Sequence, residues 1–300
     1  MEQIMQGKTV IVTGANSGIG YVTARELAKM GARVMMVCRS QSKGEAARQR
    51  IAQEATGAPP ELVLADFASL NSVRRAASEL LERCPRIDVL VNNAGIFVSE
   101  PLASADGYEL TFAVNHLAPF LLTNLLLDRI VASAPARIVN VSSFAHVAGK
   151  IMIPQIASPQ RPNISQAYSD SKLCNILFTN ELARRLQGSG VTANSLHPGA
   201  VATNFAADAR GLFAFFFRLA RPFMLSPEQG AETSIYLASS PEVAGVSGVY
   251  FVRKKPAQPS AAAQDAALAR RLWEFSEQLV REKRSSLSSS CPKHPANLTS

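Results

Sequence analysis

The feature that most constrains this chain is a regular alternation between short apolar runs and segments of helical periodicity. The apolar runs are rich in Val and Ile, which is typical of strands buried on both faces of a sheet. The segments between them repeat apolar side chains every three or four residues, which predicts helices. Predicted strands cover residues 8–13, 33–38, 61–65, 88–91, 136–141, 191–196 and 249–252, and predicted helices cover residues 18–30, 42–55, 69–83, 107–132, 166–187 and 265–283.

This order of elements predicts a doubly wound α/β fold, with helices on both faces of a mainly parallel, seven-stranded sheet. We expect one domain over residues 1–283, which ends in the helix at 265–283, and a Ser-rich, disordered tail over residues 284–300. Residues 144–165 and 199–227 interrupt the alternation. Long segments of this kind are usually lids or binding loops, and we expect residues 199–227 to form a lid over a substrate.

The composition limits the cellular compartment and the class of ligand, but it does not by itself indicate the function. The net charge of +8 suits a nucleic acid, an anionic membrane surface or a phosphorylated cofactor, and charge alone does not choose among them. The four cysteines form no CxxC pair, and His146 and His197 lack the spacing of metal ligands, so we expect no metal. We find no signal peptide and no run of about 20 apolar residues. These observations favour a cytoplasmic protein.

A glycine-rich turn stands between the first predicted strand and the first predicted helix, as Thr13-Gly-Ala-Asn-Ser-Gly-Ile-Gly20. The spacing is GxxxGxG, where Gly14 permits a tight turn, Gly18 a close approach of the backbone to a pyrophosphate, and Gly20 close packing of helix on sheet. The free N–H groups of the helix then face the phosphates. This context predicts a dinucleotide site.

The end of the second predicted strand indicates which dinucleotide. An NAD enzyme would place a carboxylate there for the ribose 2′-hydroxyl, but this chain has Cys38-Arg39-Ser40, followed by Lys43. A guanidinium suits the 2′-phosphate of NADP(H), although Arg39 could instead be a solvated loop residue. Asp66, past the third strand, could accept a hydrogen bond from the adenine amine or could be a turn residue.

Tyr168 and Lys172 lie four residues apart in a predicted helix, so they share a face. A nearby cation and an oxidised nicotinamide would favour the phenolate of Tyr168, which suits acid–base catalysis. Hydroxyls follow the strand at 136–141, and from chemistry alone either Ser142 or Ser143 could act. Asn92-Asn93-Ala94-Gly95 ends the neighbouring strand at the same edge of the sheet.

Together these motifs resemble the short-chain dehydrogenase/reductase family. The matching segments are TGANSGIG (13–20), NNAG (92–95), Asn115, VSS (141–143), YxxxK (168–172) and HPG (197–199). The resemblance implies a single Rossmann-type domain in which Ser143 binds the substrate oxygen, Tyr168 transfers the proton, Lys172 supports it and Asn115 holds a relay water. It implies a cofactor site made of Gly14, Asn16, Ser17, Gly18, Ile19, Gly20, Arg39, Lys43, Asp66, Phe67, Asn92, Ala94, Gly95, Tyr168, Lys172, Pro198, Gly199, Val201 and Thr203.

Within that family the chain looks like the retinol dehydrogenase branch, through VNHLAPFLLT (114–123), VSSFAH (141–146) and YSDSKLCNILFTNEL (168–182). The resemblance implies NADP(H)-dependent interconversion of a carbonyl and an alcohol on a lipophilic substrate, such as a retinoid or an aldehyde. A steroid or xenobiotic ketone is an alternative substrate. A dinucleotide-sensing protein without turnover is the alternative function.

Partners are suggested by two further features. The aromatic run Phe213–Phe217 could line an apolar pocket or lid, or it could contact a membrane surface, which would make the protein peripheral to a membrane. Trp273 favours packing in the core or at a subunit interface. Related enzymes often form a homodimer through the helices near Asn115 and Tyr168, and we expect no nucleic-acid partner.

Overall fold

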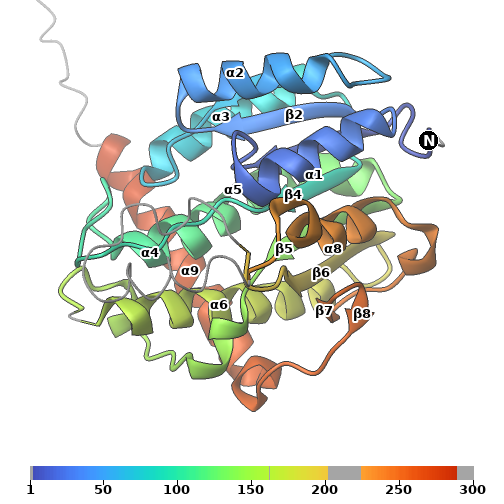
Figure 1. The fold of residues 1–300 in the computed structure, drawn as a ribbon. Helices are drawn as coiled ribbons and strands as arrows, with labels where there is room; N and C mark the ends of the chain where they lie inside the picture. Colours follow the sequence, from blue (N-terminus) through green and yellow to red (C-terminus); the bar gives the residue numbers. More distant parts are fainter. Residues whose placement is uncertain (1–2, 162, 202–223, 289–300) are drawn as a thin grey trace, which may run out of the picture.

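Eight strands form one twisted sheet in the computed structural model, which describes residues 3–161, 163–201 and 224–288 (Figure 1). The strand order is β3-β2-β1-β4-β5-β6-β7-β8, and all neighbours are parallel except β7 and β8. The strands that form the sheet are β1 (Thr9–Thr13), β2 (Arg33–Cys38), β3 (Glu61–Leu64), β4 (Val89–Asn92), β5 (Ala136–Val141), β6 (Val191–His197), β7 (Tyr250–Val252) and β8 (Lys255–Pro256).

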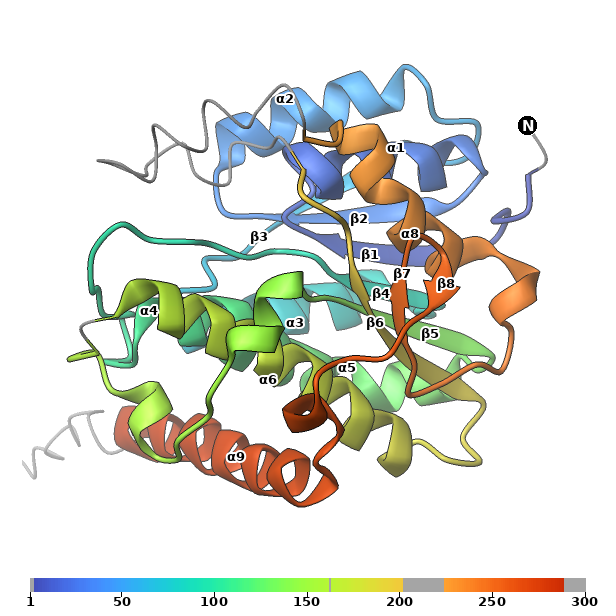
Figure 2. The ribbon, with the colours of Figure 1, turned by 60° about the horizontal axis from the view of Figure 1, so that its bottom comes forward.

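Helices cover both faces of this sheet, as expected (Figures 1 and 2). On one face α1 (Gly18–Lys29), α2 (Gln41–Ala52) and α8 (Pro227–Ser239) close one apolar core. On the other face α3 (Leu70–Arg83), α5 (Ala118–Ala132) and α6 (Ile164–Arg185) close a second core, together with α9 (Ala266–Ser288). The sheet is therefore buried on both sides, which explains the continuous apolar strands.

The sheet has one strand more than the seven predicted. The extra strand, β8, returns beside β7 through a two-residue turn at Arg253 and Lys254, which have φ values of 50° and 64°. Such turns usually carry Asn or Gly because both positions need positive φ, so Arg253 and Lys254 do not predict a hairpin. Tertiary contacts stabilise this turn: the Lys254 N–H donates to Thr233 Oγ1 at 3.2 Å, and Nζ pairs with Glu232 at 2.9 Å.

Three predicted segments differ in detail from the structure. The helix expected from residue 107 begins as α4 (Leu110–Phe112), because the Glu109 carboxylate accepts the N–H groups of Thr111 and Phe112 and caps it. The loop expected over residues 144–165 contains short 3₁₀ turns at Phe144–Ala148 and Gln155–Ala157. The last helix continues to Ser288, so residues 284–288 of the predicted tail are helical, and residues 289–300 lie outside the described residues.

One helical stretch, Leu110–Ala132, is long and apolar enough to cross a membrane by length and composition alone, which corrects the expectation that the sequence has no such run. Of its most apolar window, 78% is buried inside the protein. Its apolar side chains belong to the core beneath the sheet, with Phe112, Leu117 and Leu122 fully buried. It is a core helix of this fold.

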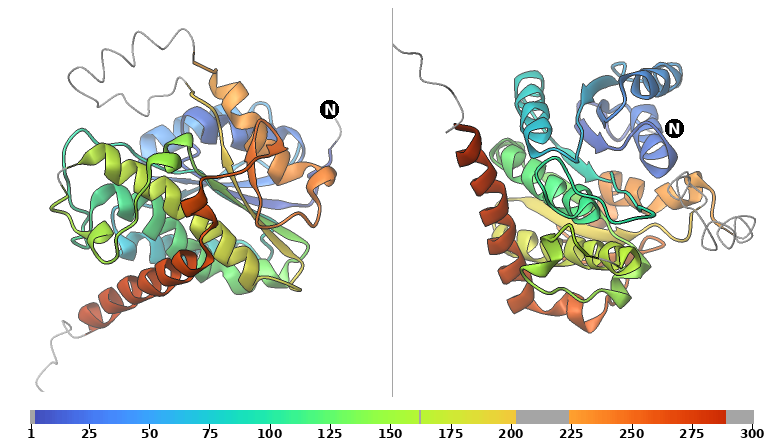
Figure 3. Two further views of the ribbon diagram at one scale, coloured as in Figure 1. Left: turned by 90° about the horizontal axis from the view of Figure 1, so that it is seen from below. Right: turned by 90° about the vertical axis from the view of Figure 1, so that its left-hand side faces the viewer.

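The final helix, α9, lies along the outside of α6 (Figure 3). Trp273 is buried there, with its ring 5.0 Å from that of Phe120 and 5.7 Å from that of Phe178, so it packs in the core. The buried His116 ring meets the Ser276 hydroxyl through Nε2 at 2.9 Å. Because that hydroxyl already donates to the Leu272 carbonyl, His116 Nε2 is the donor.

We expect His116 to make the fold sensitive to acid. Burial lowers the pKa of His116 from 6.5 to about 3, so between these values only the unfolded chain binds the proton. A histidine with a depressed pKa therefore costs the folded state about 1.4 kcal/mol per pH unit below 6.5. Urea unfolding of His116→Gln, which keeps a donor for Ser276, should show a loss of stability between pH 7.5 and pH 5 that is about 2 kcal/mol smaller than in the wild type. Equal losses in both proteins would contradict this assignment.

Candidate active site

The carboxyl ends of β1 and β4 are tied together at one edge of the sheet. The Thr13 hydroxyl oxygen accepts the N–H groups of Asn93 and Ala94 at 3.0 and 2.9 Å. The Asn93 amide donates in return to the Thr13 carbonyl at 2.8 Å. These bonds fix the glycine-rich turn against the NNAG segment, so both face the same crevice, where α/β sheets bind their ligands.

The glycine-rich turn has the shape of a phosphate cradle. Gly14 and Gly18 have φ values of 67° and 54°, which side chains rarely adopt. A Cβ placed on Gly20 would overlap the Asn93 amide and the Gly14 carbonyl. The Ser17 side chain forms no hydrogen bond that caps α1, which leaves the first N–H groups of this twelve-residue helix available to an anion. The turn therefore fits the diphosphate of a dinucleotide.

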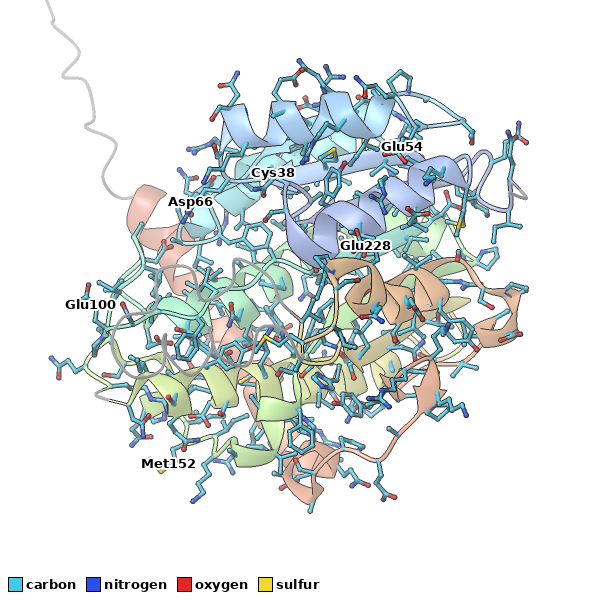
Figure 4. All side chains as sticks on the ribbon, viewed as in Figure 1. Cys38, Glu54, Asp66, Glu100, Met152 and Glu228 are labelled. Atoms are coloured by element: carbon cyan, nitrogen blue, oxygen red, sulfur yellow. The ribbon has the colours of Figure 1, made fainter. Side chains whose placement is uncertain are left out.

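The residues predicted to choose the cofactor lie at the ends of β2 and β3. Arg39 and Lys43 are exposed, and Arg39 has no ion pair with another residue in the described part of the chain. Asp66 is also exposed, and its Oδ1 accepts the Ala68 N–H at 2.9 Å, as in a turn, while a contact of this carboxylate with the adenine amine stays a prediction. Phe67 beside it is buried. Figure 4 shows Cys38, at the end of β2, and Asp66 on the same side of the molecule.

The structure separates the two serines that chemistry alone left open. Ser142 is buried, and its hydroxyl donates to the Lys172 carbonyl at 2.7 Å. Ser143 is half-buried, and its hydroxyl lies near enough to the Tyr168 phenol to act on the pKa of that group. Ser143 Oγ also accepts the Ala145 N–H at 3.2 Å, which caps the following turn. Ser143 is therefore the serine that meets the tyrosine.

Burial dominates the electrostatics of Tyr168 and Lys172. Lys172 Nζ lies 5.6 Å from the centroid of the Tyr168 ring and donates to the Val141 carbonyl at 3.3 Å. Burial lowers the pKa of Lys172 to about 8. Burial also raises the pKa of Tyr168 to about 12, while the nearby Ser143 hydroxyl acts in the opposite direction. The chain by itself thus keeps the phenol protonated at neutral pH, whereas we expected the lysine and an oxidised nicotinamide to favour the phenolate.

Asn115 lies in a π-helical turn, Ala113–Leu117, between α4 and α5. Its side chain accepts the Ile96 N–H at 2.7 Å and donates to the Ile96 carbonyl and to Ser171 Oγ, both at 3.0 Å. One amide thereby joins the loop after β4 to α6. A Cβ placed on Gly95 would lie 3.2 Å from Asn115 Oδ1 and 3.4 Å from Lys172 Nζ, so the glycine allows this close approach.

The side chain of Asn92 does not face the crevice, so the predicted contact of Asn92 with the cofactor would use its backbone. Its amide is buried and donates to Thr123 Oγ1 at 3.0 Å and to Asn140 Oδ1 at 2.8 Å. Asn92 is still inside β4, so strand alternation turns its side chain into the core. Ala94 and Gly95, which follow the strand, are half-buried at the edge.

The segment after β6 lies over the start of α1 and α8. Gly199, after Pro198, has a φ of 95°, and Val201 pairs with Leu225 in an isolated bridge. A Cβ placed on Gly230 of α8 would lie 2.6 Å from Val201 Cγ2 and 3.2 Å from Ile19 Cγ1, so these elements are in close contact. Thr203, the aromatic run Phe213–Phe217 and most of the predicted lid at 199–227 lie outside the described residues.

Four apolar side chains that the sequence motifs do not single out lie next to Tyr168 or on the turns that follow Ser143. The Phe97 ring meets the Tyr168 ring edge-on, with 5.4 Å between centroids. Phe144, directly after Ser143, is 66% exposed, and Val147 and Met152 are 53% and 65% exposed. Figure 4 places Met152 at the outer surface. Phe97 is not part of any motif, and its contact with Tyr168 could not be predicted from the sequence because only the fold brings the two rings together.

Metal chemistry finds no support in the ranges that the structure describes. They contain no group of three or more His, Cys, Asp or Glu side chains that could hold an ion. His146 and His197 instead form hydrogen bonds with the backbone next to Ser143.

Comparison with known proteins gives the family. Residues 8–211 match the short chain dehydrogenase family. The chain belongs to the short-chain dehydrogenase/reductase family. It is 49% identical to mouse retinol dehydrogenase 14 over 295 residues, which span 92% of this chain and 87% of that protein.

Solved structures agree with this assignment. A crystal structure of an uncharacterized protein from Mycobacterium paratuberculosis superposes with a TM-score of 0.75 at 38% identity, covering 92% of this chain and 94% of that one. A structure assigned to an NAD(P)-dependent gluconate 5-dehydrogenase from Beutenbergia cavernae, with NADP bound at low occupancy, gives 0.67 at 30% identity, covering 84% and 97%. This family member lies in the retinol dehydrogenase-like branch and is an oxidoreductase that acts on CH–OH groups.

We expect Gly20→Ala to weaken dinucleotide binding at least tenfold, about 1.4 kcal/mol, because the new methyl overlaps the Asn93 amide and the Gly14 carbonyl. Fluorescence titration with NADPH measures the affinity. Gly44→Ala in α2 is the matched control, since its methyl meets the flexible end of the Leu62 side chain of β3. Unchanged affinity in a folded Gly20→Ala protein would refute the phosphate cradle.

Proposed function

We propose that the protein interconverts a carbonyl and an alcohol on a lipophilic substrate with NADP(H). The observation that carries the proposal is the approach of the Ser143 hydroxyl to Tyr168, beside the buried Lys172 ammonium, at the sheet edge that also holds the phosphate cradle. Ser143 follows β5, Tyr168 and Lys172 belong to α6, and the three side chains meet only in the folded chain. A sensor without turnover would not need this arrangement.

The dinucleotide would be held by the Gly14–Gly20 turn at its diphosphate and by Lys172 at the nicotinamide ribose, and when bound it supplies or accepts the hydride. Ser143 donates a hydrogen bond to the carbonyl oxygen of the substrate. Tyr168, protonated at neutral pH, gives its proton to that oxygen as it becomes a hydroxyl. The Lys172 ammonium stabilises the resulting phenolate. Alcohol oxidation reverses these proton steps.

The preference for NADP(H) rests on Arg39 and Lys43. Both are exposed at the carboxyl edge beyond β2, where they can reach a 2′-phosphate. No carboxylate follows β2, since the strand ends at Cys38 and continues with Arg39 and Ser40. The similar structure from Beutenbergia cavernae contains NADP, which agrees with this preference.

A lipophilic substrate is supported by the apolar rim of the site. Phe97 packs on Tyr168, and Phe144, Val147 and Met152 present exposed apolar surface on the turns that follow Ser143. Phe97 and Phe144 thus offer an apolar substrate two aromatic contacts next to Tyr168 and Ser143. The relatives named retinol dehydrogenases point to a long polyene aldehyde or alcohol, while a steroid or xenobiotic ketone would suit the same rim.

The helix α9 bears on the predicted homodimer. Its Trp273 covers Phe178 of α6 and Phe120 of α5, so these parts of the two helices are already occupied. We infer that any pairing of two chains uses other faces. Contact of Phe213–Phe217 with a membrane stays a prediction, because that run lies outside the described residues.

We expect Tyr168→Phe to lower kcat about 1000-fold, because the variant removes the proton donor. The assay follows NADPH oxidation with aldehydes of increasing apolar length, including all-trans-retinal, and kcat/KM should rise with that length. Tyr236→Phe is the matched control, since its hydroxyl donates to Glu242 on the surface. Full activity of Tyr168→Phe would refute the mechanism, and equal kcat/KM along the series would refute the lipophilic substrate.

We expect Arg39→Ala to raise KM for NADPH at least tenfold and to leave KM for NADH nearly unchanged, because only NADPH carries the 2′-phosphate. Initial rates with each cofactor measure the two constants. Arg281→Ala, which removes an exposed guanidinium on α9, is the control for net charge. Equal effects on both cofactors would remove the argument for 2′-phosphate recognition.

A further inference from the structure

One peptide group next to the site is held at both of its polar ends by histidines. The peptide joins Ser143 to Phe144, so it contains the Ser143 carbonyl and the Phe144 N–H. His146 Nδ1 lies 2.7 Å from the Ser143 carbonyl oxygen, and the Phe144 N–H donates to His197 Nδ1 at 3.2 Å. Both histidines belong to segments that resemble the family, HPG (197–199) and VSSFAH (141–146), but neither side chain was given a role in the chemistry.

The partners of each ring fix where its proton sits. His197, the last residue of β6, accepts the Phe144 N–H at Nδ1, so its proton is on Nε2. The second nitrogen of His146, Nε2, accepts the Ser260 N–H at 3.2 Å, so its proton is on Nδ1 and is donated to the Ser143 carbonyl. The two neutral rings therefore have opposite tautomers. His146 offers a donor to the Ser143 carbonyl, and His197 offers an acceptor to the Phe144 N–H.

Burial keeps both rings neutral near neutral pH. It lowers the pKa of His197 to about 4, and nearby His146 and Arg253 act in the same direction. Burial also lowers the pKa of His146, against a raising effect of the Ser143 carbonyl. A charged imidazole could not accept the N–H at either acceptor nitrogen.

The orientation of this peptide determines where the Ser143 hydroxyl points. Ser143 is extended, with a ψ of 159°, and its Oγ accepts the Ala145 N–H two residues on. Its carbonyl also accepts the His146 N–H at 3.1 Å, which begins the 3₁₀ turn. Rotation of the peptide plane would break the bonds of the Ser143 carbonyl and displace Ala145, whose N–H holds the Ser143 hydroxyl near Tyr168.

We propose that His146 and His197 are positioning residues that clamp the Ser143–Phe144 peptide and thereby set the Ser143 hydroxyl against Tyr168. The clamp joins three parts of the chain, since His197 ends β6 and His146 is bound to Ser260, which precedes α9. The proposal rests on the proposed function for its catalytic consequence. Its geometry does not depend on the identity of the substrate.

The first test compares His197→Leu with His197→Asn. Leucine has no acceptor for the Phe144 N–H, whereas the Asn oxygen can take the place of Nδ1. We expect His197→Leu to lower kcat about 100-fold, as a displaced catalytic group does, with the NADPH dissociation constant and the aldehyde KM within about threefold. His197→Asn should recover at least tenfold of that loss. Equal kcat in the two variants, or a loss confined to KM, would overturn the clamp.

The second test does not need activity, so it also serves if His197→Leu fails to fold. The chain has four histidines, and two-bond ¹H–¹⁵N correlation spectra of ¹⁵N-histidine-labelled protein report the tautomer of each ring. Spectra of His146→Asn and His197→Asn assign the two signals. At pH 7.5 we expect Nδ1–H for His146 and Nε2–H for His197. The opposite tautomers, or charged rings, would overturn the proposal.

The two proposals can fail separately. A wild-type protein with the expected tautomers that is inactive on every aldehyde would overturn the proposed function and leave the clamp geometry in place. An active wild-type protein whose His197→Leu variant folds and keeps its kcat would overturn the clamp alone.

Discussion

The burial of the Lys172 ammonium is the constraint around which this site is built. Nζ is buried and has no carboxylate partner among the described residues, and it donates to the Val141 carbonyl instead. A buried charge without a counterion is costly, and here the cost appears as a lowered pKa. A carboxylate partner would stabilise the ammonium, but it would also compete with a ribose hydroxyl and a phenolate for the same N–H groups. Oxygens that carry no charge leave the ammonium available to a ribose hydroxyl and to a phenolate.

The same burial decides the state of Tyr168. The sequence showed a lysine one helical turn away, which suggested an ionised phenol. The structure buries Lys172 and half-buries Tyr168, where the loss of water disfavours either charge, and the phenol keeps its proton. This state suits a group that gives a proton to a carbonyl oxygen. For alcohol oxidation, the positive charge of an oxidised nicotinamide would shift the protonation equilibrium of Tyr168 toward the phenolate, which accepts a proton.

Sequence reasoning reached those parts of the fold and site that depend on local pattern and on the geometry of parallel sheets. Apolar strands between helices predict a sheet whose carboxyl ends converge, and that edge does hold the Gly14–Gly20 turn, Ser143 and Tyr168. What it missed depends on tertiary contacts. The inward turn of Asn92 depends on where β4 ends, the β7–β8 hairpin on contacts of Lys254, and the histidine clamp on the pairing of β5 with β6.

The last helix has a consequence for how the chain is made. α9 covers apolar surface on α6 and α5, and it accepts hydrogen bonds at its carboxyl end from Tyr108 and Arg74, which lie far earlier in the sequence. A ribosome therefore delivers the catalytic residues well before it delivers the cover for the helices that carry them. During that interval the apolar faces of α5 and α6 that α9 later covers are exposed to water. Exposed apolar surface of this kind favours chaperone binding or aggregation of the nascent chain. The side chains of α9 take no part in the chemistry, yet this core cannot be completed until α9 has been synthesised.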